Sequence, residues 1–230
     1  MRRFLLALCL VFAALPARAG ELTVAVGTNF QKTLEALVPG FEAQSGDKVT
    51  VVGGSTGKLA TQINAGAPYD IFLSADDKAT KKVKAVEGSE ITYAIGALAL
   101  YGAEGPEALK GDFKHLAIAN PKLSPYGVAA EQAIAKLGLT EAVKDRIVQA
   151  ETVVQATTMV ETGNAELGLV ALSLVKGKAG KYWVVPAQDH DPIRQNAVAL
   201  TGSDAAKAFL AYLQSDAAKA IIEDAGYTAP

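Results

Sequence analysis

Short polar residues stand where two helices of this chain are expected to begin. Thr28 and Asn29 follow an apolar strand, and Ser55 and Thr56 lie in the glycine-rich turn 53–57. These residue types are preferred at helix N-termini, where unpaired N–H groups carry about half a positive charge. Such a turn can bind an anion without a basic side chain. The chemistry that these residues could perform is therefore oxyanion binding by neutral donors.

Two more helix starts in the second half of the chain have the same character. Ser124 and Tyr126 flank a proline at the first helical position, and the segment 152–155 opens another helix. We expect these four strand-to-helix turns to meet in a cleft at the carboxyl ends of their strands. Helix capping alone would explain any one of them, so the hypothesis depends on the four together.

Enzymatic alternatives lack the residues that they need. The turn at 53–58 is not a nucleotide-binding P-loop, because Val52 stands where that motif has glycine and Leu59 where it has Ser or Thr. The two histidines, His115 and His190, have no partner at metal-ligand spacing. No Gly-x-Ser-x-Gly motif occurs. We expect no catalytic residue, no cofactor and no free metal ion.

The first nineteen residues have the pattern of a secretory signal peptide. Two arginines precede the apolar run 4–15, and the small-x-small sequence 17–19 predicts cleavage after Ala19. The apolar run is too short to span a bilayer, and the one cysteine, Cys9, lies within it. We therefore expect an exported protein whose mature chain is held together by a hydrophobic core instead of disulfides.

The mature chain is acidic. Without the three arginines of the signal peptide, the 22 basic residues become 19, against 24 acidic residues, which gives a net charge of −5. An acidic protein is a poor partner for nucleic acid or for an anionic membrane surface, so neither is expected.

Predicted strands and helices alternate along the chain, which is typical of parallel βαβ units with helices on both faces of a sheet. The expected strands are 21–26, 48–52, 69–74, 92–101, 115–119, 146–150, 167–171, 182–185 and 197–201. The expected helices start at 28 and cover 58–65, 76–86, 124–138, 139–145 and 154–162, with two C-terminal helices opened by Ser203 and Ser215.

Two of these strands are expected to connect different sheets. The apolar run 92–101 is long enough to leave one sheet and enter another, and strand 197–201 crosses back. The prediction is an α/β protein of two lobes, each a mainly parallel sheet flanked by helices, joined by two crossing segments. Lobe I comprises 20–95 with 199–230, and lobe II comprises 96–198. A ligand is expected between them.

Several stretches of the chain resemble the periplasmic molybdate-binding proteins of molybdate ABC transporters. They are Gly27-Thr28-Asn29-Phe30, Gly53 to Leu59, Gln62 to Asp76, Ala119-Asn120-Pro121, Pro125-Tyr126-Gly127 and Leu167 to Val170. The run 62–76 is the most specific, and the resemblance covers nearly the whole mature chain. Thr-Asn in the first loop and Tyr in the third are similar to one branch of that family.

The resemblance implies a periplasmic-binding-protein fold that holds a tetrahedral oxyanion with neutral donors in a closed cleft. Carried over residue by residue, the ligand contacts are Thr28, Asn29, Ser55, Thr56, Tyr126 and Val153. Thr56 stands where Ser is usual, and Ala171 stands where the better-known branch has a Tyr. Whether Lys58 or Ser55 contacts the ligand is left open.

The same resemblance implies a ligand and a partner. The expected ligand is molybdate, with tungstate as a second ligand. The expected partner is the membrane permease of an ABC importer, and the protein itself is expected to be a monomer. A receptor for sulfate or phosphate is the alternative, although a phosphate receptor usually offers an acidic side chain and an arginine, which no site loop here supplies. An α/β enzyme of similar shape is the third hypothesis.

Overall fold

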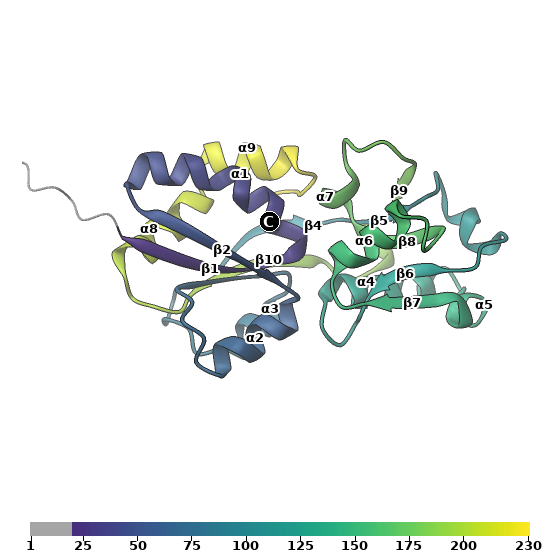
Figure 1. Cartoon of the computed structure of the whole chain (residues 1–230), viewed down its shortest axis with the longest axis horizontal. Helices are drawn as coiled ribbons and strands as arrows, with labels where there is room; N and C mark the ends of the chain where they lie inside the picture. The colour runs from purple at the N-terminus through teal and green to yellow at the C-terminus, as the bar shows by residue number, and fades with distance from the viewer. Residues whose placement is uncertain (1–19) are drawn as a thin grey trace, which may run out of the picture.

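The computed structural model describes residues 20–230, so the predicted signal peptide 1–19 and its cleavage site lie outside the described residues. The chain forms two five-stranded sheets, each flanked by helices, which lie side by side as two lobes (Figure 1). The predicted α/β, two-lobed fold is confirmed. Within residues 20–230, no helix is both long enough and apolar enough to cross a membrane.

The first sheet has the strand order β2-β1-β3-β10-β4. Its strands are β1 (Glu21–Gly27), β2 (Lys48–Gly54), β3 (Ile71–Ser74), β4 (Ile91–Gly96) and β10 (Ile193–Ala199). β1 pairs in parallel with β2 and β3, whereas β10 is antiparallel to β3 and β4. Its helices are α1 (Thr28–Ser45), α2 (Thr56–Asn64), α3 (Asp77–Thr80), α8 (Asp204–Leu213) and α9 (Asp216–Asp224).

Alternation along β1 divides the core of the first lobe between the two faces of the sheet. Val24 and Val26 pack in one cluster with Phe30 and Leu34 of α1. The same cluster also contains residues of α8 and α9. Ala25 points to the opposite face and joins a smaller cluster with residues of α2 and α3. Helices therefore cover both faces, and the sheet is buried between them (Figure 1).

The second sheet has the order β7-β6-β8-β5-β9. Its strands are β5 (Leu98–Tyr101), β6 (Leu116–Ala119), β7 (Ile147–Ala150), β8 (Leu167–Ala171) and β9 (Tyr182–Val184). The helices of this lobe are α4 (Pro125–Lys136), α5 (Thr140–Val143), α6 (Val153–Glu161) and α7 (Leu172–Val175), with the 3₁₀ turns η1 (Pro106–Lys110), η2 (Lys144–Arg146) and η3 (Ala187–Asp189). One apolar cluster forms the core of this lobe.

Two segments connect the sheets. The predicted crossing run divides at Ala97 into β4 of the first sheet and β5 of the second. The chain returns through β10, which begins at Ile193, earlier than the predicted strand 197–201 and before the lobe boundary expected at residue 199. The early part of β10 was missed because Gln195 and Asn196 are polar, yet both are buried in the sheet. The division into lobes by residue number stays a proposal.

The predicted helix 76–86 is wrong in length, because α3 contains only Asp77–Thr80. Asp76 caps this turn through its side chain, which accepts a hydrogen bond from Ala79 N. Beyond Thr80 the chain leaves the helix, and Val86 N donates to Ala199 O at 2.8 Å. This contact with β10 draws the segment toward the sheet. The short helix α7 was not predicted.

Candidate functional site

The N-termini of α1, α2, α4 and α6 follow the carboxyl ends of β1, β2, β6 and β7. Contacts between their loops place these helix starts together across the junction of the lobes. Gly57 N donates to Leu123 O at 2.9 Å, and Lys58 Nζ lies 2.6 Å from the Glu151 carboxylate. The ammonium group of Lys58 is therefore engaged by Glu151, and the Lys58 side chain is half exposed.

Three of these helices begin without a side-chain cap. α1 begins at Thr28 and its N-cap residue is Gly27, so the expected capping role of Thr28 and Asn29 is wrong. Ser55 and Ser124 occupy the N-cap positions of α2 and α4, but neither side chain makes a capping hydrogen bond. The first N–H groups of a helix have no intrahelical partner. In α1, α2 and α4, no cap side chain occupies them.

The two C-terminal helices, α8 and α9, are capped in the ordinary way by serine side chains. Ser203 accepts a hydrogen bond from Ala206 N at the start of α8, and Ser215 accepts one from Ala218 N at the start of α9. The sequence predicts helix starts at both serines, and both are confirmed. Ser203 and Ser215 therefore cap their helices, whereas Ser55 and Ser124 at the starts of α2 and α4 do not.

α6 begins with a capping box. Thr152 Oγ1 accepts a hydrogen bond from Gln155 N at 3.1 Å, and Gln155 Oε1 accepts from Glu151 N at 3.0 Å and from Thr152 N at 3.3 Å. These bonds fix the direction of the first turn. None of them uses the N–H group of Val153, the buried first residue of the helix.

Two hydroxyl groups lie at the start of α2. Ser55 is 3% exposed, and its Oγ has no hydrogen-bond partner. Thr56 Oγ1 accepts a hydrogen bond from Ala75 N at 3.3 Å, which leaves its own proton to be donated. A Cβ built on Gly27 would lie 2.8 Å from Asn29 Oδ1 and 3.4 Å from Thr56 Oγ1, so the first turns of α1 and α2 meet beside Gly27.

Asn29 is buried and fixed by residues that are remote in the sequence. Its Nδ2 donates to Gln195 Oε1 at 2.8 Å and to the Tyr227 hydroxyl at 3.1 Å, and Tyr227 in turn donates to Asn29 O at 2.8 Å. Neither Gln195 nor Tyr227 was predicted. They lie 166 and 198 positions from Asn29, and no local pattern of the sequence indicates either contact.

Tyr126 extends from the start of α4 toward the first lobe. Its side chain is buried, its hydroxyl has no hydrogen-bond partner, and a Cβ on Gly96 of β4 would collide with it. Burial raises the pKa of Tyr126 and of Tyr93 well above the usual value, and raises the pKa of Tyr227 to about 12. These hydroxyls are therefore neutral near pH 7.

The residues predicted to bind the ligand carry no formal charge. Ala171, at the buried end of β8, supplies no hydroxyl. Within residues 20–230, no group of three or more His, Cys, Asp or Glu residues could hold a metal ion. The arrangement offers backbone N–H groups and hydroxyls, which suit an oxyanion.

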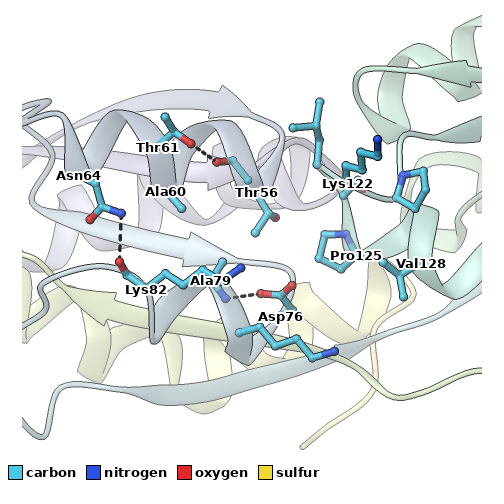
Figure 2. Close-up of a pocket in the computed structure, with 15 residues that line it drawn as sticks. Thr56, Ala60, Thr61, Asn64, Asp76, Ala79, Lys82, Lys122, Pro125 and Val128 are labelled. Atoms are coloured by element: carbon cyan, nitrogen blue, oxygen red, sulfur yellow. Dashed lines mark hydrogen bonds between the residues drawn. The ribbon is translucent and has the colours of Figure 1, made fainter.

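A groove of about 410 Å³ opens beside Thr56 between the lobes (Figure 2). Figure 2 shows Thr56 and Ala60 of α2 on one side, and Lys122, Pro125 and Val128 of the second lobe facing them. Thr56 lines the groove, whereas the other five predicted ligand residues do not. The groove thus lies next to the meeting helix starts and is distinct from them.

Three exposed lysines line this groove: Lys78, Lys82 and Lys122. Among the described residues, no carboxylate lies within 4.0 Å of any of their ammonium groups. Asp76 also lines the groove, and one of its oxygens accepts the hydrogen bond that caps α3. The groove wall therefore has an excess of positive charge in a protein whose net charge is negative.

Comparison with known proteins gives consistent matches along the chain. Residues 22–228 match the family described as bacterial extracellular solute-binding protein. The chain is 44% identical to the molybdate-binding protein ModA of Azotobacter vinelandii, over 99% of this chain and 97% of the relative. It is 42% identical to ModA of Rhodobacter capsulatus, over 96% and 94%. The solved Azotobacter vinelandii periplasmic molybdate-binding protein superposes with a TM-score of 0.86 at 38% identity, covering 91% of this chain and 99% of that one.

Proposed function

Because the chain belongs to the bacterial extracellular solute-binding protein family, we propose that it captures molybdate in the periplasm and delivers it to the permease of an ABC importer. Tungstate, which has the same tetrahedral shape and charge, is the second proposed ligand. The protein acts as a monomer that binds and releases its ligand without catalysis. Relatives at 44% and 42% identity that are named molybdate-binding proteins support this choice of ligand.

The observation that carries the proposal is the set of donors without a side-chain partner where the helix starts meet. The first turns of α1, α2 and α4 lack side-chain caps, and Ser55 Oγ is buried without a partner. A buried dianion loses its hydration, and several preorganised hydrogen bonds to the charged oxygens offset that cost. We assign these bonds to Thr28, Asn29, Ser55, Thr56, Tyr126 and Val153. Because both side-chain amide protons of Asn29 are engaged by Gln195 and Tyr227, Asn29 contributes its backbone N–H group.

Neutral donors favour selection by size over selection by charge. Molybdate and sulfate are both tetrahedral dianions, so a site without a dominant charge distinguishes them by the spacing of its donors and by its volume. The methyl group of Thr56 adds bulk to that site. A sulfate or phosphate receptor remains the alternative function, and the anion comparison below separates the two.

The proposed donors come from both lobes, so capture requires the lobes to close on the anion. Thr28 to Thr56 belong to the first lobe, whereas Tyr126 and Val153 belong to the second. In the structure the loops of the two lobes are already in contact, so we propose that the lobes open and close around the crossing segments at Ala97 and Ile193, as in other hinged proteins. The permease would then recognise the closed form.

Calorimetric titration of residues 20–230 with molybdate, tungstate, sulfate and phosphate tests the proposal, in a buffer free of all four anions. We expect tight binding of molybdate and tungstate and no heat from sulfate or phosphate. If only sulfate or phosphate binds, the proposed ligand is wrong but the proposed oxyanion site stands. Binding of none of the four would overturn the proposed function.

A further inference from the structure

Tyr227, near the C-terminus, reaches the first turn of α1 from the far end of the chain. Its side chain is 3% exposed, and its ring packs edge-on against Phe30, with the ring centroids 5.3 Å apart. The neighbouring Thr228 forms an isolated bridge with Ile95, in which each N–H group donates to the other residue's carbonyl. The C-terminal segment is thereby attached to β4 beside the first crossing segment.

The hydroxyl of Tyr227 holds Asn29 at two points. It donates to the Asn29 carbonyl oxygen at 2.8 Å and accepts a hydrogen bond from Asn29 Nδ2 at 3.1 Å. The second proton of that amide goes to Gln195 Oε1. With both protons of Nδ2 engaged, Asn29 Oδ1 faces the space beside Gly27 and Thr56. The side-chain orientation and the backbone of Asn29 are fixed together.

The second lobe joins this network through α7. Ser173 Oγ donates to Asn29 O at 3.0 Å and lies 3.0 Å from the Tyr227 hydroxyl. Three residues further on, Lys176 Nζ donates to Asp224 O at the end of α9, where a helix favours a cation. α7 therefore docks on three parts of the first lobe: the start of α1, the end of α9 and the C-terminal segment.

We propose that Tyr227 is a positioning residue for the oxyanion site, acting through Asn29, and that Ser173 completes its network only when the lobes are closed. This inference rests on the proposed function, because it assigns Asn29 to the ligand site. Tyr227 itself does not touch the ligand. Its hydroxyl sets the position of the first turn of α1 and couples that position to the second lobe.

The chain supplies a matched control in Tyr212. That residue is 7% exposed, its hydroxyl donates to Leu37 O of α1 at 3.1 Å, and its ring packs against Phe41. Its hydroxyl therefore donates to a backbone carbonyl of the same helix, about two turns beyond Asn29. Replacing either tyrosine by phenylalanine keeps the ring and removes only the hydroxyl.

The experiment compares molybdate binding by the wild type, Tyr227→Phe and Tyr212→Phe. Two hydrogen bonds to Asn29 are lost in Tyr227→Phe, so we expect its Kd to rise about tenfold, and the Kd of Tyr212→Phe to change less than about twofold. Both variants should lower the denaturation midpoint. Equal Kd values for the two variants would overturn the inference.

Ser173→Ala gives a second, independent measurement by stopped-flow kinetics. Because the Ser173 contact belongs to the closed form, we expect faster molybdate release by about threefold with an unchanged association rate. An unchanged release rate would contradict the coupling between the lobes. If the wild type binds molybdate and these variants match it, only the inference fails, whereas a wild type that binds none of the four anions overturns the proposed function as well.

Discussion

Ser55 shows how the proposed binding site would conflict with stability at the scale of a single residue. A buried hydroxyl without a partner costs about 1 to 3 kcal/mol. We therefore expect Ser55→Ala to raise the free energy of unfolding of the ligand-free protein by about 1 kcal/mol and to raise the molybdate Kd about tenfold. Denaturant titration and calorimetry measure the two effects.

Thr61→Ala is the control for that variant. Thr61 lies on the same helix, is exposed, and donates to Gly57 O within the helix. We expect little change in its affinity for molybdate. A Ser55→Ala protein that is less stable and binds as tightly as the wild type would show that the hydroxyl serves the fold and not the ligand.

Buried tyrosines predict a loss of stability at alkaline pH. Tyr227 has a pKa of about 12 in the folded protein, chiefly because of its burial, whereas an unfolded tyrosine ionises near pH 10. Between these values the unfolded state releases a proton that the folded state keeps, so stability falls as pH rises. We expect the free energy of unfolding to decline from about pH 10 toward pH 12, measured by denaturant titration with tyrosinate absorbance. Tyr227→Phe should decline less steeply, and equal slopes would contradict the assignment.

At the scale of the element, we expect the cap of α6 to have a role in ligand binding that the cap of α8 lacks. Thr152→Ala removes the capping hydrogen bond beside Val153, and Ser203→Ala removes an equivalent bond away from the site. We expect each change to lower the free energy of unfolding by about 1 kcal/mol. Only Thr152→Ala should also weaken molybdate binding, because it loosens the turn that presents Val153 N. Equal affinities in calorimetry would place α6 outside the ligand site.

At the scale of the whole molecule, the groove between the lobes predicts how an anion approaches an acidic protein. Clustered positive charge raises the local concentration of anions, and salt screens the effect. We expect simultaneous replacement of Lys78, Lys82 and Lys122 by Gln to lower the association rate of molybdate severalfold at low ionic strength, and to leave the release rate nearly unchanged. Stopped-flow kinetics at several salt concentrations measures this.

The matched control changes the net charge equally at a distance from the groove. It replaces three lysines that lie outside the groove lining by Gln: Lys110, Lys144 and Lys207. Since these lysines are exposed and paired with neighbouring acids, their loss should affect association less. The same rate loss in both triple variants would attribute the effect to overall charge and not to the groove.

Local signals allowed much of the architecture to be predicted from the sequence. The alternation along β1 and the apolar face of α1 determine buried surfaces by themselves, and Ser203 and Ser215 determine helix starts through bonds to residues three positions away. The polar residues that follow β1 and β2 likewise indicated the two turns that we assign to the proposed oxyanion site. Each of these signals depends on neighbours within a turn or a strand.

The tertiary structure alone decided how polar groups are satisfied over long distances. The sequence predicts that Asn29 caps a helix. In the structure its side-chain amide instead donates hydrogen bonds to Gln195 and Tyr227. The predicted start of β10 lies too far along the chain, because the buried Asn196 forms hydrogen bonds with Glu90 and Thr92, which precede it by about a hundred positions. The sequence by itself determined most helix and strand positions, because helix periodicity, strand alternation and serine caps are local signals. Only the packing of the two lobes decided that Ser55 and Tyr126 are buried with unpaired hydroxyls where the helix starts meet.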